Sequence, residues 1–415
     1  MLHVQFPRSY RKFLSLPVLG PIADALDDWL ATTGYTRSSR EVSITMLPYV
    51  DAELRRRGVK QLTDLTLPVL HDSWRTLRKT YPVSARTVLS LERYLVANSL
   101  IANGQTATAT SSAAMLIEEY AHHLCEVRGL AASTVSHHRY TAQCFFQHMN
   151  KKGIALKDLQ TAQIESYITQ VSKRLNRRSL QSDISAVRGF LRFLALDRRV
   201  PPDLAGQIDR PRVHSLEQLP RALPWDTVRA LLQSIERTSA KGVRDYAMFL
   251  LIATYGLRTS DVVAITLDDL GWRQRSLRIH QHKTASPLEL PLTNEVTCAL
   301  VRHLKRTPPP PPYRRIFMRT RAPLGALKPA AVTEAFDCWA RKSGLSIPFH
   351  GPHCLRHSLA VHLLKKGTPL KTIGDILGHR CADSTSTYLR LATGDLRGVA
   401  LPVPGRERQA KRGRP

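Results

Sequence analysis

The apolar residues of this chain recur every three to four positions along most of its length, which is the spacing of amphipathic helices. Two stretches of the N-terminal half share an outline, "ATTGYTRSSREVSITMLPYVDAELRRRGVKQLTDLT" and "EVRGLAASTVSHHRYTAQCFFQHMNKKGIALKDLQ". Gly34 and Gly58 of the first fall on Gly129 and Gly153 of the second at one common offset. In each stretch, one helical pattern ends before the first glycine and another ends in a basic run before the second. We therefore expect two all-helical modules of similar shape, with coincidence between generic amphipathic helices as the alternative.

The C-terminal half combines helical spacing with one stretch of strand character. In "LPWDTVRALLQSI", Pro224 stands where a first helical turn tolerates proline. In "SLRIHQHKTASPLELPL", Leu277 and Ile279, then Leu288 and Leu290, alternate with polar residues around a Lys-Thr-Ala-Ser turn, which predicts a small β-hairpin. Three helical segments with glycine or proline at their edges follow: "VTEAFDCWARKSG", "GPHCLRHSLAVHLLKKG" and "TPLKTIGDILGH".

Two stretches without helical spacing divide the chain. Residues 104–112 are small and polar, and residues 199–220 contain four prolines, so both are typical of linkers. The predicted fold is mainly α and multi-domain, with helical modules ahead of a mostly helical C-terminal domain that contains a small β-sheet or hairpin. The expected parts are an N-terminal helical module at 1–103, a second helical domain at 113–198, a linker at 199–220, a C-terminal domain at 221–400 and a basic tail at 401–415.

The charge of the chain indicates a polyanionic partner. Sixty-one Lys and Arg against 33 Asp and Glu leave a net charge of +28 over 415 residues. An acidic membrane surface would also attract this charge, but the longest apolar stretch, Tyr246–Leu257, is too short to span a bilayer. The basic N-terminus is broken by Pro17 and has no clear cleavage site, so we expect no secretory signal and a cytoplasmic protein. Six cysteines without a CxxC pair fit free thiols better than a zinc site or disulfides.

Two local patterns could bind a phosphate. His353 and Arg356 stand three positions apart at the start of a helix, so both lie on one side of it, and a helix N-terminus attracts anions. A basic helix face with a capping histidine would explain the same residues. Arg258 in "YGLRTSDVVAITLDDL" follows an apolar helix, and Asp261 could orient its guanidinium group. An exposed arginine with a local ion pair is the alternative there.

Three further residues are candidates for chemistry. Lys283 lies at the hairpin turn, where an ammonium group could reach a bound strand, although most turn lysines only keep sheet edges soluble. The segment "ILGHRCADSTSTYLRL" contains His379 after a Leu-Gly pair and then Tyr388. This tyrosine is either a buried aromatic residue among Leu389 and Leu391 or a nucleophile held beside a histidine.

Together these patterns resemble the signature of the tyrosine recombinase (phage integrase) family of DNA strand-exchange enzymes. The elements are the arginine of "YGLR", the hairpin lysine in "HKT", the His-x-x-Arg of "HCLRH", the Leu-Gly-His and the tyrosine of "STSTYLRL". The match covers Leu219 to about Leu391, and Ala113–Ala195 resembles the helical core-binding domain of the family. The layout also resembles recombinases encoded by transposable elements. The ordered set is Arg258, Lys283, His353, Arg356, His379 and Tyr388.

The resemblance implies covalent chemistry at a phosphate. Tyr388 would attack the scissile phosphate, form a 3′-phosphotyrosine bond and release a 5′-hydroxyl group, with Lys283 as the acid for the leaving oxygen. A phenol has a pKa of about 10, so it needs a nearby base or a cationic field. Bond energy would be kept in the phosphotyrosine link, and the chain has no GxxxxGK[ST] motif, so ATP is not required. We expect no metal or other cofactor, because the set holds a single carboxylate, Asp261.

The resemblance also assigns the remaining members of the set. Arg258 and Arg356 would hold the non-bridging oxygens of the phosphate, and Asp261 would support Arg258. His353 and His379 would transfer protons and donate hydrogen bonds. Fixed cationic donors of this kind lower the barrier where negative charge develops on the phosphoryl oxygens.

The expected function is therefore site-specific DNA recombination or integration, including transposition of a mobile element. The implied partners are double-stranded DNA, a homotetramer on two DNA sites and related recombinases. The module at 1–103 could bind DNA outside the crossover or contact a sister subunit, and the tail at 401–415 could add phosphate contacts. Three alternatives stay open: a type IB topoisomerase-like nicking and closing enzyme, a catalytically inactive DNA-binding accessory protein, and a metal-dependent nuclease.

Overall fold

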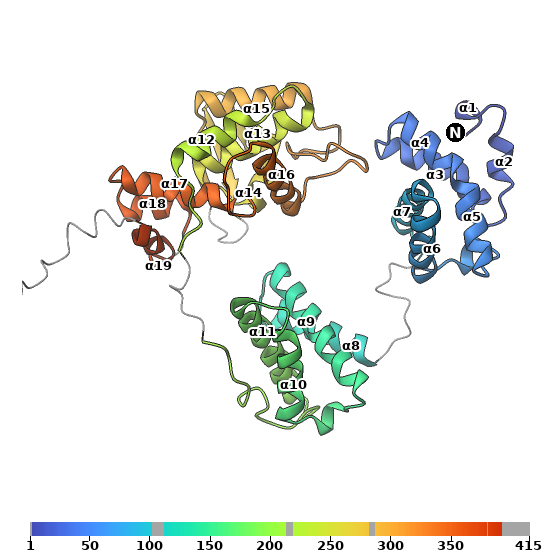
Figure 1. Ribbon diagram of the computed structural model, residues 1–415, viewed down its shortest axis with the longest axis horizontal. Helices are drawn as coiled ribbons and strands as arrows, with labels where there is room; N and C mark the ends of the chain where they lie inside the picture. Colours follow the sequence, from blue (N-terminus) through green and yellow to red (C-terminus); the bar gives the residue numbers. More distant parts are fainter. Residues whose placement is uncertain (1, 102–111, 213–218, 282–286, 380, 392–415) are drawn as a thin grey trace, which may run out of the picture. The chain divides into compact units, whose positions relative to one another are not determined.

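The computed structural model of the chain describes residues 2–101, 112–212, 219–281, 287–379 and 381–391 (Figure 1). Lys283, the tail at 401–415 and most of the first expected linker lie outside these ranges. Contacts divide the chain into two compact units, Met1–Asp27 with Glu41–Glu217, and Asp28–Arg40 with Gln218–Pro415. Of the helices in the described ranges, none combines the length and apolar character that crossing a bilayer requires.

Residues 2–101 are helical, as the apolar spacing predicts. Asp51 is fully buried in α5, and its Oδ1 accepts hydrogen bonds from the backbone N–H groups of Val18 and Leu19, just ahead of α3. This carboxylate therefore satisfies two backbone donors at the start of a helix that would otherwise be buried without a partner. The elements are α1 (Leu2–Gln5), α2 (Tyr10–Leu14), α3 (Gly20–Thr32), α4 (Arg37–Thr45), α5 (Leu47–Arg56), η1 (Leu62–Asp64), α6 (Leu67–Thr80) and α7 (Pro82–Ala97).

Residues 112–208 form a second helical group with its own apolar core. The hydroxyl group of Tyr120 lies 2.9 Å from Nδ1 of His138 on the next long helix, and Gly189 has no side chain that would block this approach. Val200 and Ile208, within the expected linker at 199–220, are buried in the same core, so the first half of that segment packs on the helices. The elements are α8 (Ser112–His122), the π-helix η2 (His123–Val127), α9 (Ala132–Lys151), η3 (Leu156–Asp158), α10 (Thr161–Ser172) and α11 (Arg177–Leu196).

The two groups share the order of elements that the sequence predicts. Gly34 and Gly129 each come just after a helix, and the φ angles of these two glycines are positive, at 86° and 59°. Gly58 and Gly153 do so again, at 86° and 67°, and each is followed by a three-residue 3-10 helix and two α-helices. The groups differ in three places: α1 and α2 precede α3 in the first group only, η2 follows α8 in the second group only, and α4 and α5 stand where the second group has the single helix α9. The predicted likeness in element order is therefore confirmed within each group.

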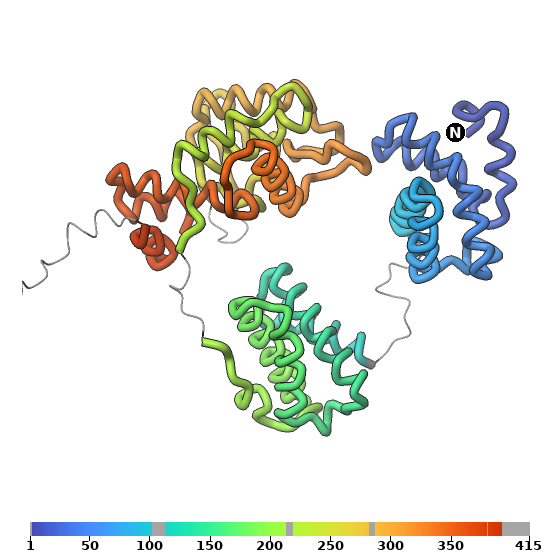
Figure 2. The backbone as a smooth tube through the Cα atoms, in the orientation of Figure 1, coloured from blue at the N-terminus to red at the C-terminus, as the bar shows by residue number. Residues whose placement is uncertain are grey.

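The C-terminal group is mostly helical (Figures 1 and 2) and contains a small antiparallel sheet. Its three strands lie in the order β1-β2-β3, and Leu277 pairs with Leu290 and Ile279 with Leu288, which confirms the predicted hairpin. The elements are α12 (Trp225–Ser234), α13 (Ala240–Tyr255), α14 (Thr259–Ala264), η4 (Leu267–Asp269), β1 (Leu270–Gly271), β2 (Ser276–His280), β3 (Pro287–Pro291), α15 (Asn294–Arg306), α16 (Pro329–Lys342), α17 (His353–Lys365), α18 (Leu370–Leu377), α19 (Asp383–Ser386) and η5 (Thr387–Leu391).

Helix α13 is the centre of this group, because every residue from Ala247 to Ala253 is buried and α12, α14, α15, α16 and α17 all pack against it. A helix that is apolar on all sides is stable only when neighbours surround it. Its second turn carries a buried ion pair. Asp245 accepts hydrogen bonds from Arg244 at 2.7 Å and from the indole N–H of Trp339 in α16 at 2.9 Å, and Lys241 lies 3.0 Å from it.

This ion pair gives a test of the packing around α13. In Asp245→Ala, the buried guanidinium group of Arg244 loses its carboxylate, so we expect the free energy of unfolding to fall by about 3–5 kcal/mol. Chemical denaturation followed by circular dichroism measures the change. The matched control is Asp226→Ala in α12, whose carboxylate is 86% exposed beside Arg229 and should change stability by less than about 0.5 kcal/mol. Equal losses in the two variants would contradict the interpretation.

Candidate active site

The end of α13 places the first candidate arginine. Gly256 closes the helix with a φ of 64°, and a Cβ atom there would lie 2.4 Å from a methyl group of Leu377, so both backbone conformation and packing require glycine. The chain turns at this residue, and Arg258 becomes the N-cap of α14. The predicted break before a new helix is confirmed, and it directs Arg258 toward the end of α18.

Three groups hold the guanidinium of Arg258. Its Nη1 donates to Oε1 of Gln281 at 3.1 Å, and its Nη2 donates to the carbonyl oxygen of Gly378 at 3.3 Å. The buried carboxylate of Asp261 lies 3.7 Å from Nη1, so Asp261 supports this arginine as the sequence predicts. Arg258 is therefore oriented by contacts from α14, from the residue after β2 and from the end of α18.

Arg356 lies beside it on α17 and is only 3% exposed. Its Nη1 donates to the carbonyl oxygen of Gly256, and its Nη2 donates to that of Leu377 at 2.8 Å. Burial lowers the pKa of Arg356 to about 10, and the charge of Arg258 contributes to the same shift. The side chain still carries its charge at neutral pH. The two arginines are thus held by carbonyl groups at the C-terminal ends of α13 and α18.

Two histidines of α17 follow the same helix face. His353 is exposed at the first position of the helix, and His357 lies one turn later with its ring edge-on to that of His353, at 4.5 Å between centroids. Nδ1 of His357 lies 3.0 Å from the hydroxyl oxygen of Tyr388. The sequence analysis did not single out His357, although its place four residues after His353 in "HCLRH" is a signal that could have identified it.

The second candidate histidine and the tyrosine follow α18. Gly378 ends that helix with a φ of 64°, and a Cβ atom there would lie 2.2 Å from the side chain of Gln281. His379 comes next, and its Nδ1 lies 2.8 Å from the hydroxyl oxygen of Thr385 in α19. Its ring is parallel to that of Tyr388 in η5, 6.4 Å away.

Tyr388 is 1% exposed and packs with the apolar residues of α17 and α18. Burial raises the pKa of this phenol, and the charges of Arg356 and Arg258 act in the opposite direction. The sequence analysis left two possibilities for Tyr388, a buried aromatic residue or a residue held beside a histidine. The structure shows that Tyr388 is both buried and next to histidines. The structure brings five of the six predicted residues into this region, and Lys283 lies outside the described residues.

Both buried histidines are neutral at neutral pH. Burial lowers the pKa of His357 to about 4, and His353, Arg356, His379 and Arg221 add to the shift. Burial likewise lowers the pKa of His379 to about 4, with contributions from Arg356, Arg258 and His353. An excess of positive charge therefore surrounds the tyrosine, which suits a negatively charged ligand.

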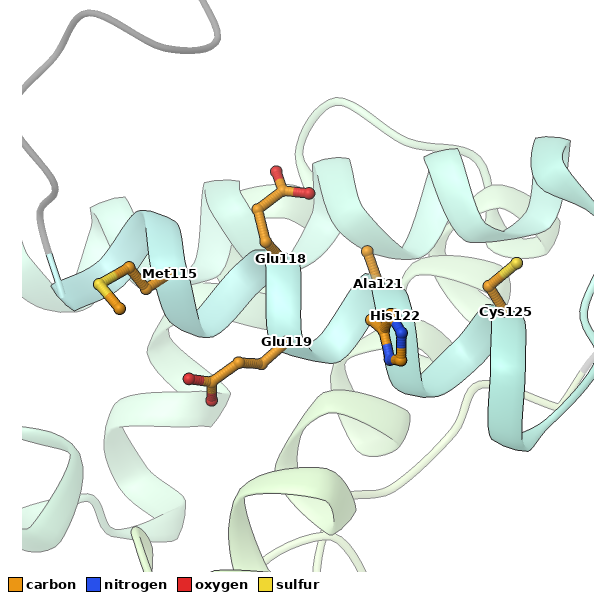
Figure 3. Close-up of a pocket in the computed structure, with 6 residues that line it drawn as sticks. All are labelled: Met115, Glu118, Glu119, Ala121, His122 and Cys125. Carbon is orange, nitrogen blue, oxygen red and sulfur yellow. The ribbon is translucent and has the colours of Figure 1, made fainter.

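A separate hollow runs along α8 and η2, lined by residues of that one helical segment (Figure 3). Its carboxylates, Glu118 and Glu119, form ion pairs with Arg139 and Arg199. Two carboxylates on its wall make this hollow a poorer site for a phosphate than the region around Tyr388. The described residues contain no group of three or more His, Cys, Asp or Glu side chains arranged to hold a metal ion.

The neutral histidines give a pH test. The unfolded chain binds a proton at each histidine near pH 6.5, whereas folded His357 and His379 do so only near pH 4, so stability falls as pH decreases between these values. We expect the slope of unfolding free energy against pH to be shallower in His357→Asn than in the wild-type protein. Denaturant titrations from pH 4 to pH 7.5 measure it. His350→Asn, at a position 92% exposed, is the control, and a slope changed equally in both variants would contradict the burial of His357 as its cause.

Comparison with known proteins agrees with this geometry. The chain matches the Phage integrase family at residues 221–394 and the Phage integrase, N-terminal SAM-like domain at residues 117–197. Putative integrase/recombinase y4rA of Sinorhizobium fredii (strain NBRC 101917 / NGR234) is 30% identical over 401 residues, which are 94% of this chain and 97% of that protein. Tyrosine recombinase XerD of Listeria monocytogenes serotype 4b (strain F2365) is 28% identical over 290 residues, covering 68% of this chain and 96% of XerD.

Solved structures show the same fold. A lambda integrase tetramer bound to a Holliday junction aligns with a TM-score of 0.52 at 19% identity, over 66% of this chain and 76% of that chain. The relative from Sinorhizobium is similar in sequence to nearly the full length of the chain, including the N-terminal helical group. The chain therefore belongs to the phage integrase family, the tyrosine-type site-specific recombinases.

Proposed function

We propose that this recombinase cleaves and rejoins strands of double-stranded DNA through a 3′-phosphotyrosine intermediate formed by Tyr388. The observation that carries the proposal is the convergence of Tyr388, Arg258, Arg356 and His379 at the C-terminal ends of α13 and α18. These residues come from four separate segments, and a purely structural tyrosine does not require two guanidinium groups beside it.

The two arginines bind the non-bridging oxygens of the scissile phosphate. Carbonyl groups orient them without cancelling their charge, so the positive field is in place before the DNA arrives. A guanidinium group matches phosphate geometry with two parallel hydrogen bonds. Since the phosphoryl oxygens gain charge in the transition state, these cations stabilise it more than the ground state.

The remaining roles concern protons and hydrogen bonds. His353, exposed at the first position of α17, and His379, fixed by Thr385, donate hydrogen bonds to the phosphate and transfer protons. Lys283 is the acid for the leaving 5′-oxygen, a role that follows from its place in the hairpin sequence. The donor set consists of cations and imidazoles with one buried carboxylate, Asp261, so the reaction proceeds without a metal ion or ATP.

The partners follow from charge and family. A net charge of +28 suits a DNA partner, and the module at 1–103 repeats the element order of the SAM-like group, so it adds a second helical contact to DNA or to a sister subunit. The lambda integrase neighbour is a tetramer on a Holliday junction, and we assign this chain a homotetramer on two DNA sites, with related recombinases as further partners.

The recombinase serves a mobile element in the cytoplasm, by integration or transposition. We assign domains at 1–103 and 221–400, and between them a helical domain that begins at 113 and extends beyond the expected limit of 198, because Val200 and Ile208 are buried in its core.

Covalent trapping tests the mechanism. Nicked duplexes that tile the DNA flanking the gene are incubated with the protein and a chelator, and adducts are resolved on a denaturing gel. We expect a protein–DNA adduct with the wild-type protein and none with Tyr388→Phe, because the phenol oxygen forms the bond. Arg258→Ala and Arg356→Ala should slow its formation by about 10²–10³-fold through the loss of one charge-stabilising group.

The matched control is Arg229→Ala, which removes an exposed arginine of α12 and should leave adduct formation unchanged. An adduct that persists in Tyr388→Phe would overturn the nucleophile assignment. Tight DNA binding without any adduct would favour the accessory-protein alternative. Cleavage of one strand without paired cleavage at a second site would favour the topoisomerase-like alternative.

A further inference from the structure

His357 contacts the nucleophilic oxygen, yet none of the roles above uses it. Its Nδ1 lies 3.0 Å from the hydroxyl oxygen of Tyr388, and the two rings are 5.6 Å apart between centroids. Tyr388 is buried in η5, and His357 is partly buried on α17, where its ring also contacts that of His353. A hydrogen bond at this distance requires one partner to donate and the other to accept.

Burial and the neighbouring groups favour acceptance by the imidazole. Burial lowers the pKa of His357, with further contributions from His353, Arg356, His379 and Arg221, so the ring is neutral at neutral pH and has one nitrogen without a proton. The phenol is neutral as well, because burial raises its pKa. A neutral phenol donates its O–H readily, and a buried hydroxyl group without a partner would cost free energy.

We propose that His357 is a further catalytic residue, whose Nδ1 accepts the hydroxyl proton of Tyr388 as the phenol oxygen attacks the scissile phosphate. The proposal deepens the proposed function and rests on it. In the step, a bond forms between the phenol oxygen and phosphorus while the bond from phosphorus to the 5′-oxygen breaks. The phenol proton passes to His357, and the leaving oxygen takes a proton from Lys283. Rejoining runs the same transfers in reverse.

The phosphate itself makes this base effective. Without DNA, burial and the cations near His357 hold its pKa near 4, too low to take a proton from a phenol. A phosphodiester bound to Arg258 and Arg356 places a negative charge among these cations, and that charge raises the pKa of the imidazole. The nucleophile therefore stays protonated until the scissile phosphate is in place, which protects the free enzyme from unproductive attack.

The pH dependence of adduct formation tests the proposal. His357→Asn keeps a hydrogen-bonding group near the position of Nδ1 but cannot take a proton. On the nicked duplex that the trapping experiment identifies, we expect adduct formation at pH 7 to be about 10²-fold slower than in the wild-type protein. The variant then depends on ionised Tyr388, so its rate of adduct formation should rise about tenfold per pH unit up to pH 9. The difference in rate from the wild-type protein should therefore shrink as pH rises. A deficit that is constant with pH would show a structural role and overturn the proposal.

A modified duplex separates the base from the acid. With a sulfur atom in place of the bridging 5′-oxygen, the leaving group needs no proton. We expect the deficit of His357→Asn to persist on this duplex, while that of Lys283→Ala disappears. Loss of the His357→Asn deficit would place the residue on the leaving-group side and contradict the proposal. The fold control is His362→Asn, on the same helix but stacked on Trp225, which should react like the wild-type protein on both duplexes.

A measurement without DNA separates this proposal from the proposed function. In protein labelled with ¹⁵N-histidine, the resonances of His357 are assigned by their loss in His357→Asn. We expect the ¹⁵N chemical shift of Nδ1 to be that of an unprotonated nitrogen that accepts a hydrogen bond. In Tyr388→Phe, this shift should move toward the value of an acceptor nitrogen without a hydrogen bond. A protonated Nδ1 would overturn the proposal even if the adduct forms. An accepting Nδ1 in a protein that forms no adduct would instead show that the proposed function has failed.

Discussion

The active-site region depends on two arginines being held by the C-terminal ends of two helices. The carbonyl groups of Gly256, Leu377 and Gly378 accept hydrogen bonds from Arg258 and Arg356. Carbonyl groups at a helix C-terminus lack intrahelical partners and carry partial negative charge, so they bind cations well. Unlike carboxylates, they do not neutralise the guanidinium groups. The positive field that a phosphate requires is therefore built into the fold, with the carboxylate of Asp261 3.7 Å from Arg258.

Both helix ends rely on glycine for this arrangement. Gly256 and Gly378 have the left-handed conformation that lets each helix stop with its last carbonyl groups turned toward the arginines. Each also lies against a neighbour that leaves no room for a side chain, Leu377 in one case and Gln281 in the other. Gln281 bonds to Arg258 as well, and it stands two residues before Lys283. The hairpin and the arginine pair are thus connected through one buried amide.

Burial and the same excess of positive charge set the state of the residues nearby. Burial, with a contribution from these charges, keeps His357 and His379 neutral, and burial keeps Tyr388 protonated, although the arginines favour its ionised form. A bound phosphate changes all of these balances together, because it adds negative charge at the centre of the group. In the proposed mechanism, electrostatics therefore couple binding of the phosphate to activation of Tyr388.

The sequence by itself determined the local features of this protein. Helical spacing and turn residues predicted α16, α17 and α18, the pairing of Leu277 with Leu290, and the repeated order of elements around Gly34 and Gly129. These features depend on residues that are close in sequence. An apolar period of two residues indicates a strand, and a period of 3.6 residues indicates a helix. The ordered motif set also identified the family, one tyrosine, and four residues that the structure places around that tyrosine.

Only the tertiary structure decided how those residues meet. The bonds from Arg356 to Gly256 and from Arg258 to Gly378 join residues 100 and 120 positions apart, and His357 meets Tyr388 across 31. Spacing placed His353 and Arg356 on one side of a helix but could not show that the first is exposed and the second buried. Burial and charge neighbours depend on which helices pack together, and that packing is set by contacts over the whole core, which no local pattern records.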